Sequence, residues 1–337
     1  MNFRTTVQDV FKALQQTGFG VIDVGSRDGL HHMFKEAASF IEAVGFEPDV
    51  DECEQLNKRL RKDTSYRSLT FLPFGLGRAD GQQILNLCRS RGVSSVYQPN
   101  RSFLDRFPDA CRYDVVDTLR IPVREFDGLL KDQKVRLPNN IDFMKIDTQG
   151  SELDILHGAR ETLRNQVVAV EVEIEFARLY ESQPLFLEVD SFLSECGFTL
   201  FKLRRVEWVR QNYEHRPHLS AGQLVFGDAL YLKDPLNPQL PWMPKDSHQA
   251  EALILISLLY DLHDFALETI SVPRIASMLN ADKVRQYIMD RSAQLNRPWS
   301  HVHTFRDLLR WFRDALRCFK RYKSHWGRGD ENFYSRC

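Results

Sequence analysis

The sequence predicts an α/β fold, a Rossmann-like doubly wound sheet with helices on both faces, followed by an all-α carboxyl-terminal extension. Runs such as Ile141–Ile146 and Val167–Val172 are apolar without polar alternation, which is typical of strands that helices cover on both faces. These runs alternate with amphipathic helical stretches, as in repeated β-α units. The extension is predicted because helical periodicity replaces strands after residue 246.

The elements of the predicted sheet follow in a regular order. The first part of the chain contains strands at 20–25, 41–46 and 68–74, separated by helical stretches at 33–40 and 50–61. After a long insertion, we expect strands at 141–146, 167–172, 198–203 and 228–232, with helices at 152–164 and 185–196. Ligands of such sheets bind beyond the carboxyl ends of the strands.

The insertion between the third strand and Ile141 carries two strand-like segments, 92–97 and 117–123. The first segment is expected to pass near the carboxyl ends of the strands, so it should cover part of the site.

Three units are predicted along the chain: a catalytic domain at 1–234, a connector at 235–246 and a helical domain at 247–337. Proline recurs every third residue in the connector, which favours an extended conformation. Helices are expected at 247–269, from Pro273, at 281–295 and at 304–322. The segment 301–337 holds nine Lys or Arg against four Asp or Glu, which indicates a solvated face or a surface for an acidic partner.

Composition excludes several classes of protein. The 45 Lys and Arg against 46 Asp and Glu give a net charge of −1, which argues against a dedicated nucleic-acid-binding protein. The six cysteines are scattered without paired spacing, as in reduced intracellular thiols. The amino terminus shows no signal peptide, and the most apolar stretch, 252–260, is shorter than the ~20 residues of a membrane span. We therefore expect a soluble, cytoplasmic protein.

A glycine turn follows the first strand, where the sequence contains Asp23, Gly25, Ser26, Arg27 and Gly29. Amide N–H groups exposed at such a turn favour a carboxylate or phosphate. The GxGxxG pattern is not met, which disfavours a nicotinamide or flavin site and with it an oxidoreductase.

An acidic residue also ends the second strand, at Glu47-Pro48. It lies ~20 residues beyond the glycine turn, where a carboxylate can accept a hydrogen bond from each of the two hydroxyls of a ribose. Pro48 offers a flat apolar surface for an adenine ring. The alternative for Glu47 is a solvated strand end.

The strand at 141–146 ends in Asp147, whose carboxylate is expected at the same edge of the sheet as Asp23 and Glu47. Thr148 or Ser151 can cap the next helix. Glu152 lies in the first turn of that helix, where the helix dipole favours a carboxylate, so it does not need a catalytic role.

Three carboxylates, Glu171, Glu173 and Glu175, alternate along the next strand and so share one face. Because a buried carboxylate is costly, this stretch should rise towards the open edge of the sheet. Glu173 is nearest Asp147 by register. A divalent metal between Asp147 and Glu173 would lack an evident third ligand, so no metal site is predicted.

These segments resemble the FkbM-type family of S-adenosylmethionine-dependent methyltransferases. The family pattern combines a D-V-G-A-N-x-G turn, an E-P strand end and the motif K-I-D-x-x-G-x-E-x-x-V-L-x-G-A. The corresponding segments here are Asp23–Gly29, Glu47-Pro48 and Lys145–Ala159. Arg27 stands where the family usually has Asn. The resemblance covers roughly residues 19–233 and leaves the helical extension unexplained.

The resemblance implies a seven-stranded methyltransferase sheet with a reversed last strand, S-adenosylmethionine as cofactor, and O-methylation of a sugar, glycan or secondary metabolite. Asp147, which follows its strand, is the first catalytic candidate, and Glu173, the nearest to it by strand register, is the second. The implied cofactor-binding residues are Asp23, Gly25, Ser26, Arg27, Gly29, Glu47, Pro48, Phe74 and Asp147. The alternative is a methyltransferase-like binding or scaffold protein whose helical extension recruits a partner. We expect a small-molecule or glycan acceptor, no nucleic acid, and possible self-association or partner contact through the extension.

Overall fold

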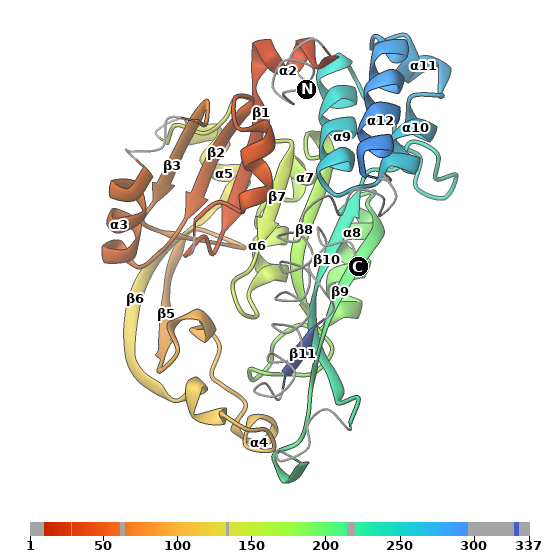
Figure 1. Cartoon of the computed structure of the whole chain (residues 1–337). Helices are drawn as coiled ribbons and strands as arrows, with labels where there is room; N and C mark the ends of the chain where they lie inside the picture. The colour runs from red at the N-terminus through yellow and green to blue at the C-terminus, as the bar shows by residue number, and fades with distance from the viewer. Residues whose placement is uncertain are drawn as a thin grey trace, which may run out of the picture.

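The protein is built on a central sheet whose strand order is β11-β9-β10-β8-β7-β1-β2-β3 (Figure 1). The computed structural model describes residues 10–27, 29–60, 65–132, 135–213, 220–295 and 327–329. The strands are β1 (Phe19–Val24), β2 (Ile41–Phe46), β3 (Ser68–Leu72), β7 (Phe143–Ile146), β8 (Ala169–Glu175), β9 (Thr199–Trp208), β10 (Gln223–Leu232) and the short edge strand β11 (Gly327–Gly329).

The directions of the strands confirm the predicted methyltransferase sheet. Strands β3, β2, β1, β7 and β8 pair in parallel. Strand β10 is inserted between β8 and β9 and runs antiparallel to both. The seven long strands therefore have the reversed last strand that the family resemblance implies, and β11 adds an eighth at the edge beside β9.

One face of the sheet packs on a purely apolar core. Val170, Val172 and Ile174 point into it from β8 and are fully buried. Four helices of this side contribute to the same core: α5 (Phe126–Asp132), α6 (Glu152–Gly158), α7 (Arg160–Asn165) and α8 (Phe186–Glu195). Burial on both faces explains why strands such as β1 and β7 are apolar along most of their length.

Helices from both ends of the chain cover the other face. They are α2 (Lys12–Thr17), η1 (His32–Ala37), α9 (Ser247–Leu259), α10 (His263–Thr269) and α12 (Ala281–Leu295). Every residue of α9 after Ser247 is buried, because the helix lies between the sheet, α2 and α10. Figure 1 shows α9, α10, α11 (Pro273–Ala276) and α12 gathered beside α2. The described part of the extension thus shares one core with the sheet, and the division of the chain at residues 234 and 246 stays a prediction.

The insertion forms a second, three-stranded sheet of order β4-β6-β5 that curves away from the carboxyl-terminal helices (Figure 1). Its strands are β4 (Gly75–Gly77), β5 (Gly81–Cys88) and β6 (Val115–Glu125). The predicted strand at 117–123 lies inside β6. The one at 92–97 was wrong: the 3₁₀ turn η2 (Arg91–Val93) and a single bridge between Asn86 and Ser95 occupy this segment.

Two predicted helices are broken. The stretch 152–164 divides into α6 and α7 at Ala159, next to Gly158, where an added Cβ would lie 2.1 Å from the carbonyl oxygen of Gly77. This close approach of β4 requires glycine. The stretch 247–269 divides into α9 and α10 at Asp261, whose φ is 58°.

Other helices follow the predictions more closely. Helix α3 (Val50–Leu60) and α12 were expected, the stretch 33–40 is a 3₁₀ helix, and the predicted helix at 304–322 lies outside the described residues. The remaining short turns are α4 (Arg101–Leu104), η3 (Ala110–Tyr113) and η4 (Gln211–Tyr213).

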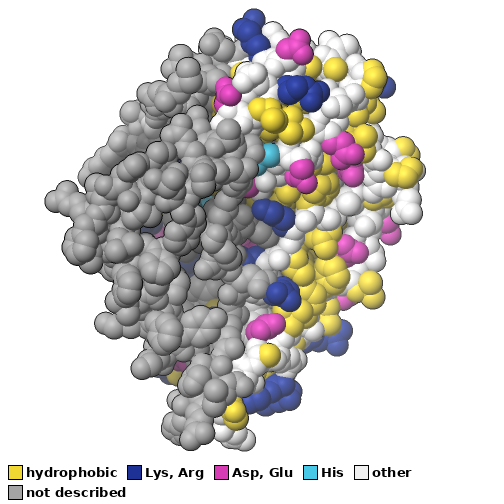
Figure 2. Space-filling model, turned by 45° about the vertical axis from the view of Figure 1, so that its right-hand side comes forward, with side chains coloured by type: hydrophobic (Ala, Val, Ile, Leu, Met, Phe, Trp, Pro, Cys, Tyr) yellow, Lys and Arg dark blue, Asp and Glu magenta, His cyan; other side chains and the backbone are white. Residues whose placement is uncertain are grey.

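On the face shown in Figure 2, hydrophobic, basic and acidic side chains intermix over the described residues, in keeping with the near-zero net charge. None of the described helices has the length and apolar character needed to cross a membrane. The four cysteines within the described residues, Cys53, Cys88, Cys111 and Cys196, are free thiols.

Candidate active site

The glycine turn after β1 is wedged between the ends of two neighbouring strands. Gly25 has φ 82°, and a Cβ added there would lie 1.9 Å from the carbonyl oxygen of Asp147. Its N–H donates to the carbonyl oxygen of Phe46 at 3.1 Å, and the Ser26 hydroxyl donates to the same oxygen at 3.4 Å. Only glycine permits both the left-handed backbone and this close approach.

Asp23 is buried beneath this turn, with 2% of its surface exposed. Burial raises the pKa of its carboxyl group to about 6, and the nearby Lys145 ammonium partly opposes this increase. Its Oδ1 atom has no hydrogen-bond partner among the described residues. Such an orphaned buried acceptor is costly unless a ligand supplies a donor.

Glu47 directly follows β2, and 5% of the residue's surface is exposed. Its Oε1 accepts the Asp49 N–H at 2.9 Å, and burial raises the pKa of the carboxyl group above its ordinary value. The Phe74 ring packs against the Phe46 ring with centroids 5.4 Å apart and so supports this strand end from behind.

Asp147 follows β7, as the sequence predicts. The Lys145 ammonium donates to its Oδ2 at 3.2 Å. In the next turn, the Glu152 carboxylate accepts the N–H groups of Thr148 at 2.8 Å and Gly150 at 2.9 Å. This explains the acidic residue at the helix start: Glu152 shapes the turn that presents Asp147.

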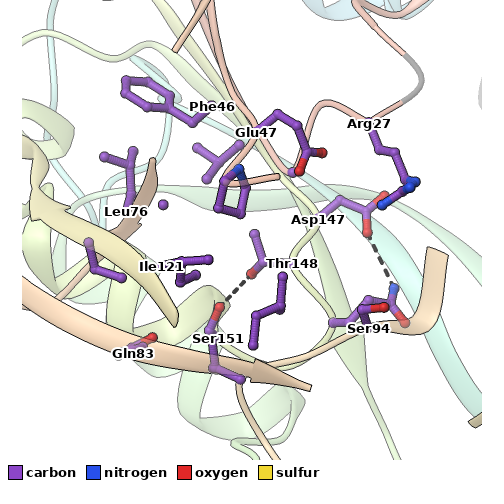
Figure 3. Close-up of a pocket in the computed structure, with 18 of the residues that line it drawn as sticks. Arg27, Phe46, Glu47, Leu76, Gln83, Ser94, Ile121, Asp147, Thr148 and Ser151 are labelled. Atoms are coloured by element: carbon purple, nitrogen blue, oxygen red, sulfur yellow. Dashed lines mark hydrogen bonds between the residues drawn. The ribbon is translucent and has the colours of Figure 1, made fainter. Parts of the chain in front are cut away.

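These strand ends enclose a cavity of about 170 Å³ (Figure 3). In that figure the charged groups of Arg27, Glu47 and Asp147 gather on one side, opposite Leu76 and Ile121. Five of the predicted site residues line the cavity: Gly25, Arg27, Glu47, Pro48 and Asp147. The other predicted residues, Asp23, Ser26, Gly29, Phe74 and Glu173, are not among its lining residues.

Most of the opposite wall comes from the insertion, which the motifs could not assign. This wall consists of Gly75, Leu76, Gln83, Leu85, Arg91, Gly92, Ser94, Val96, Ile121 and Val123. The expectation that the segment around residues 92–97 covers part of the site is confirmed, although the segment is not a strand. The sequence evidence for this inference was the expected position of the segment near the carboxyl ends of the strands.

The three glutamates of β8 lie on the sheet face opposite its valines and are all buried. Glu173 accepts a hydrogen bond from the Gln149 side-chain amide at 2.6 Å, and Glu171 accepts one from the Tyr260 hydroxyl of the extension. Burial, followed by the charge of Asp147, raises the pKa of Glu173 well above its ordinary value. Glu173 does not line the cavity itself, and among the described residues the Gln149 side chain links it to the cavity.

No group of three or more His, Cys, Asp or Glu side chains among the described residues is arranged to hold a metal ion.

The sequence matches the family described as the methyltransferase FkbM domain over residues 23–200, more than half of its 337 residues. The chain belongs to this methyltransferase family. The matched region is a methyltransferase domain, of a family that uses S-adenosylmethionine as cofactor. None of the curated proteins matches the sequence.

Solved structures resemble the methyltransferase remotely. The methyltransferase FkbM from Methylobacillus flagellatus is 15% identical, with a TM-score of 0.38. The match covers 64% of this chain and 44% of that one, so the chain spans less than half of that protein. The magnesium protoporphyrin IX methyltransferase of Synechocystis with bound cofactor is 10% identical, covering 68% and 79% of the two chains with a TM-score of 0.34. Likenesses this low say nothing further about the site.

The residues of the methyltransferase fit S-adenosylmethionine. Gly25 lines the cavity with backbone alone, and Glu47 places there a carboxylate that can accept hydrogen bonds from ribose hydroxyls. Leu76, Ile121 and Val123 supply the apolar wall that an adenine ring needs.

Proposed function

We propose that this methyltransferase transfers a methyl group from S-adenosylmethionine to a hydroxyl group of a sugar, glycan or secondary metabolite. The observation that supports this proposal is the position of Asp147. Its carboxylate lines the cavity next to the glycine turn, within the same space as Glu47. A carboxylate at that point can accept the proton of an acceptor hydroxyl.

The bound cofactor supplies an activated methyl group on a sulfonium. The task of the protein is then mainly alignment, in which positioning alone contributes several kcal/mol. In this proposal Glu47 binds the ribose, Pro48 supports the adenine, and Gly25 and Arg27 hold the amino-acid end. Asp147 orients the acceptor hydroxyl and takes its proton. Asp23 and Ser26 support the glycine turn after β1. Gly29 and Phe74 support the backbone next to the site.

The alternative is a binding or scaffold protein whose helical extension recruits a partner. The packing of α9 gives this alternative little support, because that helix is buried against the sheet instead of presenting a free face. We keep self-association through the rest of the extension as a prediction.

Transfer of a labelled methyl group tests the proposal. We expect the protein to label a hydroxyl-bearing acceptor in a panel of sugars, glycans and metabolite extracts. Asp147→Asn should bind the cofactor and lose most of the transfer, because the amide cannot accept the proton. A protein that binds S-adenosylmethionine yet labels no member of the panel would favour the binding-protein alternative.

A further inference from the structure

Gln149 has a backbone conformation that glutamine rarely adopts. Its φ is 60°, in the left-handed region, directly after the loop residue Thr148. Such a conformation costs of order 1 kcal/mol and persists only where surrounding contacts hold it. The contacts of this residue therefore call for an explanation.

The side chain of Gln149 connects the two predicted catalytic carboxyl groups. Its amide Nε2 donates to Glu173 at 2.6 Å and lies 3.4 Å from Oδ1 of Asp147. Gln149 lines the cavity together with Asp147, whereas Glu173 lies behind it. Among the described residues, the Gln149 amide thus connects the buried glutamate to the cavity.

Two neighbouring segments hold Gln149 in place. The Ser95 hydroxyl, from the insertion, donates to its backbone carbonyl at 2.6 Å. The Tyr180 hydroxyl, from the loop after β8, lies 3.2 Å from Oε1 and 2.8 Å from the carbonyl oxygen of Val93. A backbone bridge between Pro99 and Tyr180 joins these two segments. Both anchors therefore belong to one structural unit.

The hydrogen bond from the Gln149 amide should influence the protonation of the Glu173 carboxyl group. Burial and the charge of Asp147 raise the pKa of Glu173 well above its ordinary value. An N–H donor on a carboxylate stabilises its charged form and so opposes that increase. The Lys145 ammonium donates to Asp147, whereas the Gln149 amide donates to Glu173.

We propose that Gln149 is a positioning residue of the methyl-transfer site, which holds the Glu173 carboxyl group beside Asp147 and, through Ser95, ties this pair to the insertion. The inference rests on the proposed function, because it gives the carboxyl pair a role beside the cofactor. It adds a residue that neither the motifs nor the family match assigns.

The test uses the affinity for S-adenosylmethionine, measured by calorimetry between pH 5 and 9 on the full chain. Affinity should rise through a midpoint as Glu173 loses its proton, because its carboxylate attracts the sulfonium cation. In Gln149→Gly the midpoint should move up by about one pH unit, since Glu173 loses its donor. Ser95→Ala should move it in the same direction by less.

Thermal unfolding separates positioning from a merely structural role. Glycine accepts a positive φ, so the Tm of Gln149→Gly should not fall. Tyr231→Phe is the control for Ser95→Ala, because it also removes a hydroxyl. The Tyr231 hydroxyl donates to Asp190 at 2.9 Å on the opposite side of the sheet, so its loss should leave the midpoint unchanged.

Identical midpoints in wild type and Gln149→Gly would overturn the inference while leaving the proposed function intact. An unchanged midpoint in Ser95→Ala alone would remove the link to the insertion. A wild-type protein that does not bind S-adenosylmethionine would overturn both the inference and the proposed function.

Discussion

The two faces of strand β8 have opposite characters. Val170, Val172 and Ile174 enter an apolar core under four helices, while Glu171, Glu173 and Glu175 point to the other side and are also buried. The first face stabilises the sheet. The second carries charge that burial makes costly. One strand thus stabilises the apolar core on one side and holds buried carboxyl groups on the other, where the extension contributes the Tyr260 hydroxyl to Glu171.

The largest effect should come from removing the helices over the polar side. A chain that ends after Lys233 loses α9, α10 and α12 and exposes the core that they share with the sheet. We expect no cooperative thermal unfolding, measured by circular dichroism. A chain that ends after Leu295 is the control, because it loses only β11 among the described residues. A well-folded 1–233 fragment would instead support the predicted independent domain.

A substitution on each face of β8 should separate the two roles. Ile174→Ala leaves a cavity in the apolar core and should lower the free energy of unfolding by about 3 kcal/mol. Glu173→Gln removes a charge that is costly to bury and should lower it by less than ~1 kcal/mol at pH 7. Urea unfolding measures both values. Equal losses would show that the two faces do not differ as described.

The pH dependence of stability should reveal the buried Asp23. Its pKa is raised from 3.8 to about 6 in the folded protein, so the folded state binds more protons than the unfolded state between these values. Stability should therefore fall as the pH rises from about 4 to 6, by about 3 kcal/mol from this residue. Asp23→Asn should flatten this slope in urea unfolding at several pH values. If the slope of stability against pH is the same in Asp23→Asn, groups other than Asp23 cause the pH dependence.

The smallest effect is expected at Arg27, where the family usually has Asn. The guanidinium lines the cavity and lies 3.9 Å from Glu52 in a partly exposed pair. Burial raises the pKa of Glu47, and the charge of Arg27 partly opposes this increase. Arg27→Asn should weaken S-adenosylmethionine binding by no more than about fivefold, since partly exposed pairs contribute up to ~1 kcal/mol. Calorimetry decides this, and a loss above 50-fold would show that Arg27 is an essential ligand.

The sequence could predict the part of the site that strand ends create. Gly25, Glu47 and Asp147 each follow a recognisable apolar strand, and parallel strands bring their carboxyl ends to one edge. At these strand ends the residue pattern alone is enough to place the side chains, because the sheet topology follows from the same strands.

The opposite wall could not be predicted in the same way. It depends on the pairing of β5 with β6 across some 30 residues and on a 3₁₀ turn at Arg91. Gln149 was missed because its importance arises from contacts with Glu173 and Tyr180, 24 and 31 residues away. The breaks in two helices likewise come from tertiary contacts and backbone turns that periodicity does not encode.

The central claim, a cofactor site built around Glu47, is tested most directly by calorimetry with S-adenosylmethionine and NAD. We expect the wild-type protein to prefer S-adenosylmethionine, and Glu47→Ala to lose at least ~100-fold in affinity, because the ribose hydroxyls lose a buried acceptor. Glu54→Ala, which removes an exposed carboxylate of α3, should bind as the wild type does. Unchanged affinity in Glu47→Ala, or a preference for NAD, would contradict the assignment.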